Sequence, residues 1–116
     1  MIIEFKTAKL AKKAGFDTSQ FYCYDDEGKL HSNIGDYDWI KFGSNSEGSY
    51  VAPTQSELQK WLREKHDILV YVDPRRHHIF QYHIITHDNE IIGSERLNNW
   101  EKVLEKGLQK SLKLIK

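Results

Sequence analysis

The apolar positions of the chain follow a helical period in three segments, residues 7–14, 54–66 and 98–115. In the last segment, apolar and small side chains recur at alternating spacings of three and one, which gives the helix one face for a core. These side chains are Trp100, Val103, Leu104, Gly107, Leu108, Ser111, Leu112 and Ile115. The pattern therefore predicts three helices, and the last has the longest apolar face.

Capping residues mark the ends of these helices. Thr7 is the expected N-cap of the first helix, and Gly15 suits the left-handed position that follows a helix. The second helix begins at the sequence Thr54-Gln55-Ser56-Glu57, in which the threonine hydroxyl accepts an early amide and Glu57 reaches back to the cap amide. For the third helix, the sequence predicts an N-cap at Asn98 or Asn99.

Strand-like segments lie between the helices. Residues 21–24 and 30–34 flank a turn and predict a hairpin. Residues 68–72 form a continuous apolar run, which is typical of a strand covered on both faces, and Pro74 ends it. Residues 79–86 alternate as a strand does, and a short strand at 91–92 follows. The side chains expected on one face of the 79–86 strand are Phe80, Tyr82 and Ile84; those on the other are Gln81, His83 and Ile85.

A chain of 116 residues fits one domain with one core. Residues 1–50 supply a helix, the hairpin and a loop that starts near residue 35 and is rich in both turn-forming and aromatic residues. Residues 51–116 supply a helix-strands-helix unit. We therefore expect a single α+β domain, with a small, mostly antiparallel sheet packed by two or three helices.

The formal charge is balanced, with 17 Lys and Arg against 17 Asp and Glu. No field of the whole molecule draws the chain onto nucleic acid or membrane. Locally, residues 16–50 carry two lysines against seven acids, a sum of −5, whereas residues 1–15 and 98–116 each sum to +3. An electrostatic partner must therefore meet a local patch.

The single cysteine, Cys23, excludes an internal disulfide framework and a thiolate zinc site. The N-terminus carries only the apolar pair Ile2 and Ile3, which is too short for a signal peptide, and no apolar run reaches the length of a membrane span. We expect a cytoplasmic protein of a reducing compartment, without a membrane partner.

No residue pattern predicts a catalytic, cofactor or metal site. On an extended strand His83 and His87 lie about 13 Å apart, too far to share one ion, and adjacent His77 and His78 point in different directions. The acidic run at residues 25–27 precedes a glycine and is explained by a hairpin turn. Glycine-rich phosphate loops and nucleophile motifs are missing from the sequence, so a small hydrolase is only the second alternative.

The order of elements from Pro53 to Ile115 resembles a double-stranded-RNA-binding domain. Pro74, His77 and Phe80 are similar to the loop between that family's first two strands, and Gly93-Ser94 lies near its approach to the last helix. Where the family presents lysines at the start of that helix, this chain has Asn98-Asn99-Trp100-Glu101-Lys102, which weakens phosphate binding. The resemblance implies RNA binding through basic residues as an alternative function. These residues are Lys60, Arg63, Arg75, Arg76, Lys102 and Lys106.

Taken whole, the sequence resembles a group of small proteins encoded by bacteriophages and prophage-like elements of gut-associated bacteria. The likeness is carried by three stretches of helix caps and core faces, residues 7–16, 52–64 and 107–115. The resemblance implies a shared fold and a mobile-element accessory protein. The partner expected from that setting is a protein of the host or of the phage.

A non-enzymatic interaction module is the function we expect from these observations. The candidate interaction residues are the aromatic side chains of the loop, Tyr37, Trp39, Phe42 and Tyr50, because aromatic residues dominate interface energies. The alternative interpretation is that each of these side chains packs in a small core beneath the loop instead of contacting a partner. The apolar face of the last helix suits either its own sheet or a second copy in a homodimer.

Overall fold

The computed structural model describes residues 1–16, 22–32, 48–76, 78–93 and 96–115. Its backbone contacts divide the chain into two compact units, residues 2–54 and residues 55–116 together with Met1. The described residues form three helices and two antiparallel sheets of three strands each. The fold is α+β, as the sequence predicts, while a single domain stays a prediction.

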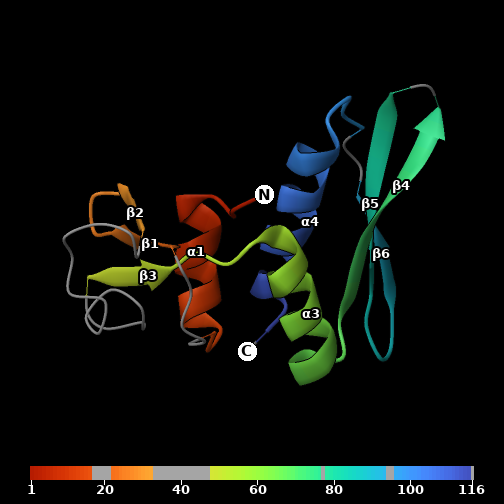
Figure 1. The fold of residues 1–116 in the computed structure, drawn as a ribbon. Coiled ribbons are helices and arrows are strands. Elements are labelled where there is room, and N and C mark those ends of the chain that lie inside the picture. Colours follow the sequence, from red (N-terminus) through yellow and green to blue (C-terminus); the bar gives the residue numbers. More distant parts are fainter. Residues whose placement is uncertain (17–21, 33–47, 77, 94–95, 116) are drawn as a thin grey trace. The chain divides into compact units, whose positions relative to one another are not determined.

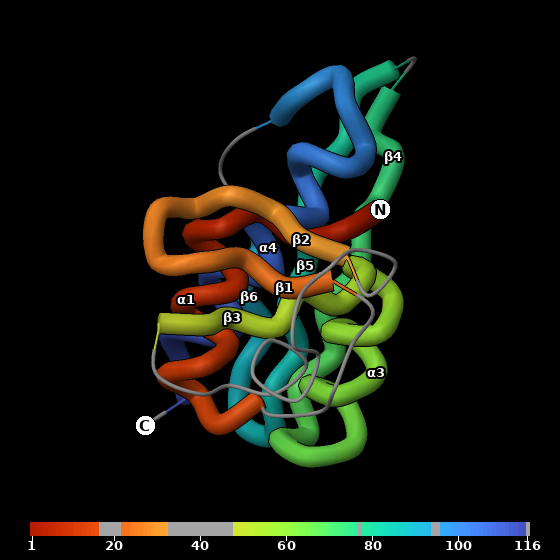
Figure 2. The backbone as a smooth tube through the Cα atoms, turned by 60° about the vertical axis from the view of Figure 1, so that its left-hand side comes forward, coloured from red at the N-terminus to blue at the C-terminus, as the bar shows by residue number. Residues whose placement is uncertain are grey.

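The N-terminal unit contains α1 (Phe5–Lys13), β1 (Tyr22–Asp25), β2 (Leu30–Ser32) and β3 (Ser49–Val51). β1 lies between the other two strands in the order β2-β1-β3, as Figure 2 shows. The hairpin of β1 and β2 confirms the prediction for this region. β3 was not expected, because its residues lie at the end of the stretch that we interpret as a loop.

Aromatic side chains pack α1 against this sheet. The ring of Phe5 lies 5.4 Å from that of Tyr24 and 5.5 Å from that of Tyr50, measured between centroids. Gly28, at the hairpin tip, has a φ of 86°, and a Cβ there would lie 2.9 Å from the Phe5 ring. The turn therefore needs glycine for its backbone conformation and for the close approach of Phe5.

α1 begins earlier than its capping pattern indicates. The N-cap position is Glu4, whose side chain makes no capping hydrogen bond, and Thr7 lies buried inside the helix. The prediction of a Thr7 N-cap is therefore wrong. At the other end Gly15 has a φ of 99°, the left-handed conformation that the sequence predicts.

The C-terminal unit contains α3 (Gln55–His66), β4 (Leu69–Arg76), β5 (Ile79–Ile85), β6 (Glu90–Ile92) and α4 (Trp100–Lys113). The strands form one antiparallel sheet in the order β4-β5-β6. Both helices lie on the same face of that sheet (Figure 1). The predicted order of helix, three strands and helix is confirmed.

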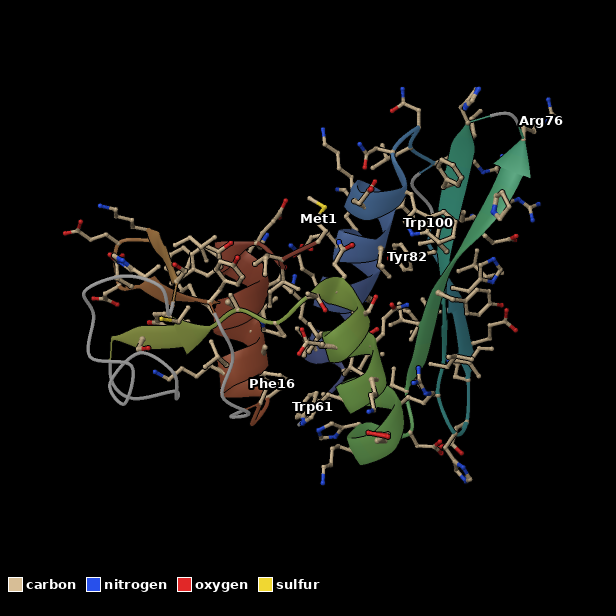
Figure 3. All side chains as sticks on the ribbon, viewed as in Figure 1. Met1, Phe16, Trp61, Arg76, Tyr82 and Trp100 are labelled. Carbon is tan, nitrogen blue, oxygen red and sulfur yellow. The ribbon has the colours of Figure 1, made fainter. Side chains whose placement is uncertain are left out.

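The core of this unit lies between the sheet and the helices. Val70 and Ile84 are buried on the sheet, as are Leu62 on α3 and Leu108 on α4. α4 approaches closely, because a Cβ added to Gly107 would lie 3.0 Å from side-chain atoms of both Val70 and Tyr82. Figure 3 shows the labelled Tyr82 between the sheet and α4.

The buried face of α4 differs from its predicted stripe at the first turn. Trp100 is 44% exposed and meets Phe80 edge-on, at 5.5 Å between ring centroids. Glu105 is buried instead, and its Oε1 accepts a hydrogen bond from Gln55 Nε2 at 3.0 Å. The N-cap prediction is confirmed at Asn99, whose Oδ1 accepts from the amide of Lys102 at 2.9 Å.

β4 differs from its prediction in length and in burial. It continues through Pro74 to Arg76, with an irregular register between them opposite β5. The strand is not covered on both faces, since Leu69 is 39% and Tyr71 36% exposed while the alternating Val70 and Val72 are buried. A continuous apolar run does not reveal this difference, because both faces carry apolar side chains.

Within the described parts of the chain, no helix is both long and apolar enough to cross a membrane.

Candidate functional site

The sheet β4-β5-β6 has one face toward α3 and α4 and a second face that no described helix or strand of the unit covers (Figure 1). Strand alternation and register assign each residue to a face. Tyr71 on β4 pairs with His83 on β5, which pairs with Ile92 on β6. We call the side opposite the helices the open face. It carries Leu69, Tyr71, Asp73, Arg76, Ile79, Gln81, His83, Ile85, Glu90 and Ile92.

Large apolar side chains concentrate on the open face. Of the nine exposed large hydrophobic residues in the described chain, five lie on it: Leu69, Tyr71, Ile79, Ile85 and Ile92, with exposures from 36% to 52%. An antiparallel sheet with one solvated face normally places polar residues there. Leu69 and Ile85 are register partners on neighbouring strands, and neighbouring exposed apolar side chains are typical of an interaction site.

His83 lies at the centre of the open face and is only 9% exposed. Its Nδ1 lies 3.2 Å from Glu90 Oε1 on β6, and its Nε2 lies 3.2 Å from Asp73 Oδ2 on β4. The ring stacks on Tyr71, with 5.1 Å between centroids and 13° between planes. One imidazole therefore links all three strands across the face.

The two carboxylates do not contact the imidazole equally. Nδ1 and Glu90 have hydrogen-bond geometry, whereas the buried Nε2 has no hydrogen-bond partner among the described residues despite its distance from Asp73. We treat the Asp73 contact as an ion pair without an aligned hydrogen bond, since direction as well as distance decides a hydrogen bond. Asp73 also lies 3.4 Å from Arg75 Nη1.

The outer edge of β4 is closed to further strand pairing. Gly93 N donates to Tyr82 O at 2.9 Å, so the backbone groups of Tyr82 point toward β6. Backbone groups alternate in direction along a strand, so Ile84, like Tyr82, also points toward β6. The backbone groups of Val70, which pairs with Ile84, therefore point away from the sheet. Gln59 Nε2 from α3 donates to the carbonyl oxygen of Val70 at 2.8 Å. Pro74 also points outward from β4, and it has no N–H to offer to another strand.

The outer edge of β6 is protected by its length and by a side chain. The strand has three residues, and its Glu90 amide donates to Asn89 Oδ1 at 2.9 Å. Short and capped edge strands are common protections against pairing with another chain. A partner of this sheet therefore meets the side chains of the open face rather than its backbone edges.

A second cluster of polar side chains lies in the N-terminal hairpin. Asp25 Oδ2 lies 2.8 Å from His31 Nε2, and Asp25 Oδ1 accepts the amides of Glu27 and Lys29, both at 2.9 Å. The hydrogen bond to His31 lowers the pKa of Asp25, and the backbone amides add to this effect. Cys23 pairs with His31 across the two strands. The sequence gives no sign of this arrangement, which depends on hairpin register.

The hairpin cluster does not have the properties of a nucleophilic centre. Cys23 is fully buried, and burial raises the pKa of its thiol, with the Asp25 carboxylate adding to the rise. A reactive cysteine needs the opposite, an accessible thiol with a lowered pKa. The contacts of Asp25 instead explain the turn, since Asp side chains stabilise tight turns by accepting backbone amides.

A hollow of about 380 Å³ lies along α1 and is lined by Phe5, Leu10 and three lysines, Lys6, Lys9 and Lys13. Lys9 Nζ lies 5.1 Å from the centre of the Phe5 ring. The lining contains no hydroxyl, thiol, imidazole or carboxylate group. In the described part of the chain, no three His, Cys, Asp or Glu side chains are arranged to hold a metal ion.

The predicted interaction residues fall mostly outside the described ranges, as Tyr37, Trp39 and Phe42 do. Tyr50 lies on β3 and is half-buried. Its ring packs on Phe5 and lies 4.6 Å from Lys12 Nζ, and its hydroxyl donates to Asp26 at 3.3 Å. Burial raises the pKa of Tyr50, and Asp26 raises it further. Tyr50 therefore packs within its own unit.

The basic residues of the RNA-binding alternative are exposed but come from three separate places. Lys60 and Arg63 lie on α3, and Arg75 and Arg76 at the end of β4. Because α3 leads into the start of β4, Arg76 lies about 23 Å along the strand from that connection. The label in Figure 3 marks this outer tip. The remaining two, Lys102 and Lys106, lie on α4, whose first turn also holds Glu101.

Comparisons with known proteins found no relative of this chain. No protein-family model matches it, no curated protein is similar to it, and no solved structure matches it. The functional argument therefore depends on the geometry of the open face.

Proposed function

We propose that this protein is a non-enzymatic binding module that recognises another protein through the open face of the sheet β4-β5-β6. The observation that carries the proposal is the gathering of five exposed apolar side chains on one sheet face. A partner that covers these side chains gains free energy, because apolar surface is driven out of water.

The composition of the open face also supports protein recognition. Protein interfaces combine an apolar or aromatic centre with a polar rim. Here Tyr71 supplies aromatic surface beside the central His83, and Leu69 and Ile85 supply apolar surface at one end. The side chains of Asp73 and Glu90 keep 34% and 52% exposure. Glu90, at the Ile85 end of the face, repels phosphates.

The test replaces one apolar residue of the open face with a charge. Ile85→Asp puts a carboxylate among the exposed apolar side chains at a site that is 36% exposed. Leu30→Asp is the matched control, because Leu30 is 41% exposed on the other sheet. Tagged proteins are incubated with lysate of a bacterial host, and bound proteins are quantified by mass spectrometry.

We expect Ile85→Asp to lose the captured partner and Leu30→Asp to keep it, with both variants folded by circular dichroism. Equal capture by wild type and Ile85→Asp would overturn the proposal. If the resemblance to phage and prophage proteins extends to function, the captured partner is a protein of the host or of the phage.

The RNA-binding alternative gives a different result. Phosphate contacts require an affinity that falls steeply with salt, and replacement of Arg75 and Arg76 by alanine would weaken binding. A salt titration with duplex RNA separates the two functions. Salt-dependent binding that Ile85→Asp leaves unchanged would favour the RNA-binding alternative.

A further inference from the structure

The size of the open face limits what can bind it. Three strands spaced about 4.8 Å apart and a central strand of seven residues give a platform of roughly 14 by 23 Å, or about 300 Å². A stable protein dimer covers about 800 Å² on each partner. The face alone is therefore smaller than the usual interface of a stable dimer, and it accommodates the width of one helix, about 10 Å.

The edges of the sheet disfavour the other common mode of peptide recognition, which adds a strand. Gln59 occupies an outward carbonyl of β4, Pro74 provides no amide, and Asn89 occupies an outward amide of the short β6. A segment on the open face must therefore satisfy its own backbone hydrogen bonds. A helix does this within itself, whereas an isolated extended strand does not.

The charges of the open face favour a basic group at one end of it. Arg75 lies beside Asp73, and Arg76 pairs with Ile79, so these charges gather near the tip of β4. Glu90 lies toward the other end of the face, where it pairs with Ile85. Within the described residues, His83 is the ion-pair partner of Glu90, and the Glu90 side chain keeps 52% exposure. The exposed ring of Tyr71 adds a surface on which a cation is attracted.

We propose that the occupant of the open face is an amphipathic helix of a partner protein, with an apolar stripe over Leu69, Ile85 and Ile92 and a Lys or Arg beside Glu90. This inference rests on the proposed function and specifies its partner. Such a helix would repeat on the open face the arrangement that α3 and α4 have on the other, which gives three layers with the sheet in the middle.

The experiment measures binding of model peptides to the full chain. The first peptide has about 14 residues of Leu and Lys at helical spacing, so that its length of about 21 Å matches β5. The second replaces every Lys with Glu, and the third alternates Leu and Lys to favour a strand. Affinity is measured by fluorescence titration, and the site by ¹⁵N chemical-shift changes.

We expect the basic helical peptide to bind at least about tenfold more tightly than the other two, with shift changes on β4, β5 and β6. Ile85→Asp should weaken its binding by more than about tenfold. Glu90→Lys should weaken it roughly threefold and strengthen the acidic peptide. Glu64→Lys, at an exposed position on α3, should leave the preference for basic over acidic peptide unchanged.

Failure of the inference is distinguishable from failure of the proposed function. If the acidic or the alternating peptide binds the open face as tightly as the basic helical peptide, the basic helix is excluded. The basic helix is also excluded if no peptide changes the ¹⁵N chemical shifts of residues on β4, β5 and β6. The proposed function survives either result when Ile85→Asp still loses the captured partner, and it fails when that variant keeps it.

Discussion

The imidazole of His83 lies nearly parallel to the ring of Tyr71, 5.1 Å away, on the uncovered face of a three-stranded sheet. The two residues are register partners on neighbouring strands. Their stack is flanked by Asp73 on one side and Glu90 on the other. An aromatic pair with carboxylates beside it, within an apolar face, is a surface for recognition, and it accounts for much of the polar chemistry of the C-terminal unit.

The contribution of His83 to stability should depend on its ring volume rather than its charge. The Nε2 is buried without a hydrogen bond, and apolar replacements of buried ionic groups are often neutral. We expect His83→Leu to change the free energy of unfolding by less than about 1 kcal/mol, and His83→Ala to lower it by about 1–3 kcal/mol because the stack is lost. Urea denaturation measures both, and equal large losses would contradict this view.

The two faces of β4-β5-β6 should respond differently to truncation. Ile84 is fully buried on the helix side, so Ile84→Ala should lower the free energy of unfolding by about 2–5 kcal/mol. Leu69 is 39% exposed on the open face, and Leu69→Ala should cost less than about 1 kcal/mol. Urea denaturation of both variants checks the pair. A loss of similar size at Leu69 would mean that the open face is covered in the isolated protein.

The close approach of α4 to its sheet should make Gly107 intolerant of alanine. Alanine favours a helix over glycine by about 1 kcal/mol, but its Cβ would lie 3.0 Å from Val70 Cγ2 and from Tyr82 Cβ. Because the Tyr82 Cβ is fixed to the strand backbone, we expect Gly107→Ala to lower stability by about 1 kcal/mol or more. Lys110→Ala, at an exposed site of the same helix, should change it by less than about 0.5 kcal/mol. Thermal unfolding distinguishes the outcomes. A higher stability of Gly107→Ala would show that α4 moves away from the sheet to accommodate the added methyl group.

The Asp25 turn should contribute to stability at neutral pH and lose that contribution in acid. The hydrogen bond from His31 and the turn amides lower the pKa of Asp25 in the folded state. A carboxyl group with a lowered pKa stabilises the fold above its unfolded pKa, near 4, and this contribution is lost as the pH falls through the folded value. We expect the melting temperatures of wild type and Asp25→Asn to differ at pH 7 and the difference to shrink as the pH falls below about 4. A constant difference down to pH 2.5 would contradict this linkage.

Cys23 should react slowly in the folded protein. It is fully buried, and burial raises the pKa of its thiol. Because only the thiolate attacks a disulfide reagent, both effects reduce the rate. We expect modification at pH 7.5 to be at least about a hundredfold slower in buffer than in urea. Rapid modification of the folded chain would contradict this expectation and would show a reactive thiol next to His31.

The sequence by itself determined the elements that depend on local chemistry. The helical period, the cap at Asn99 and the left-handed glycine after α1 are set by residues close to one another along the chain, so short-range patterns reveal them. The alternation that places Phe80, Tyr82 and Ile84 together is local as well. Locally read patterns therefore predicted the α+β class and the order of elements in the C-terminal unit.

Only the tertiary structure decided which surfaces are covered and which side chains meet. The run from Leu69 to Val72 is apolar throughout, and packing of both helices on one side of the sheet left Leu69 and Tyr71 exposed. The contacts of His83 with Asp73 and Glu90 join three strands, and strand register rather than sequence spacing sets such contacts. Side-chain pairing across strands is a long-range property, which is why the open face could not be found from the sequence.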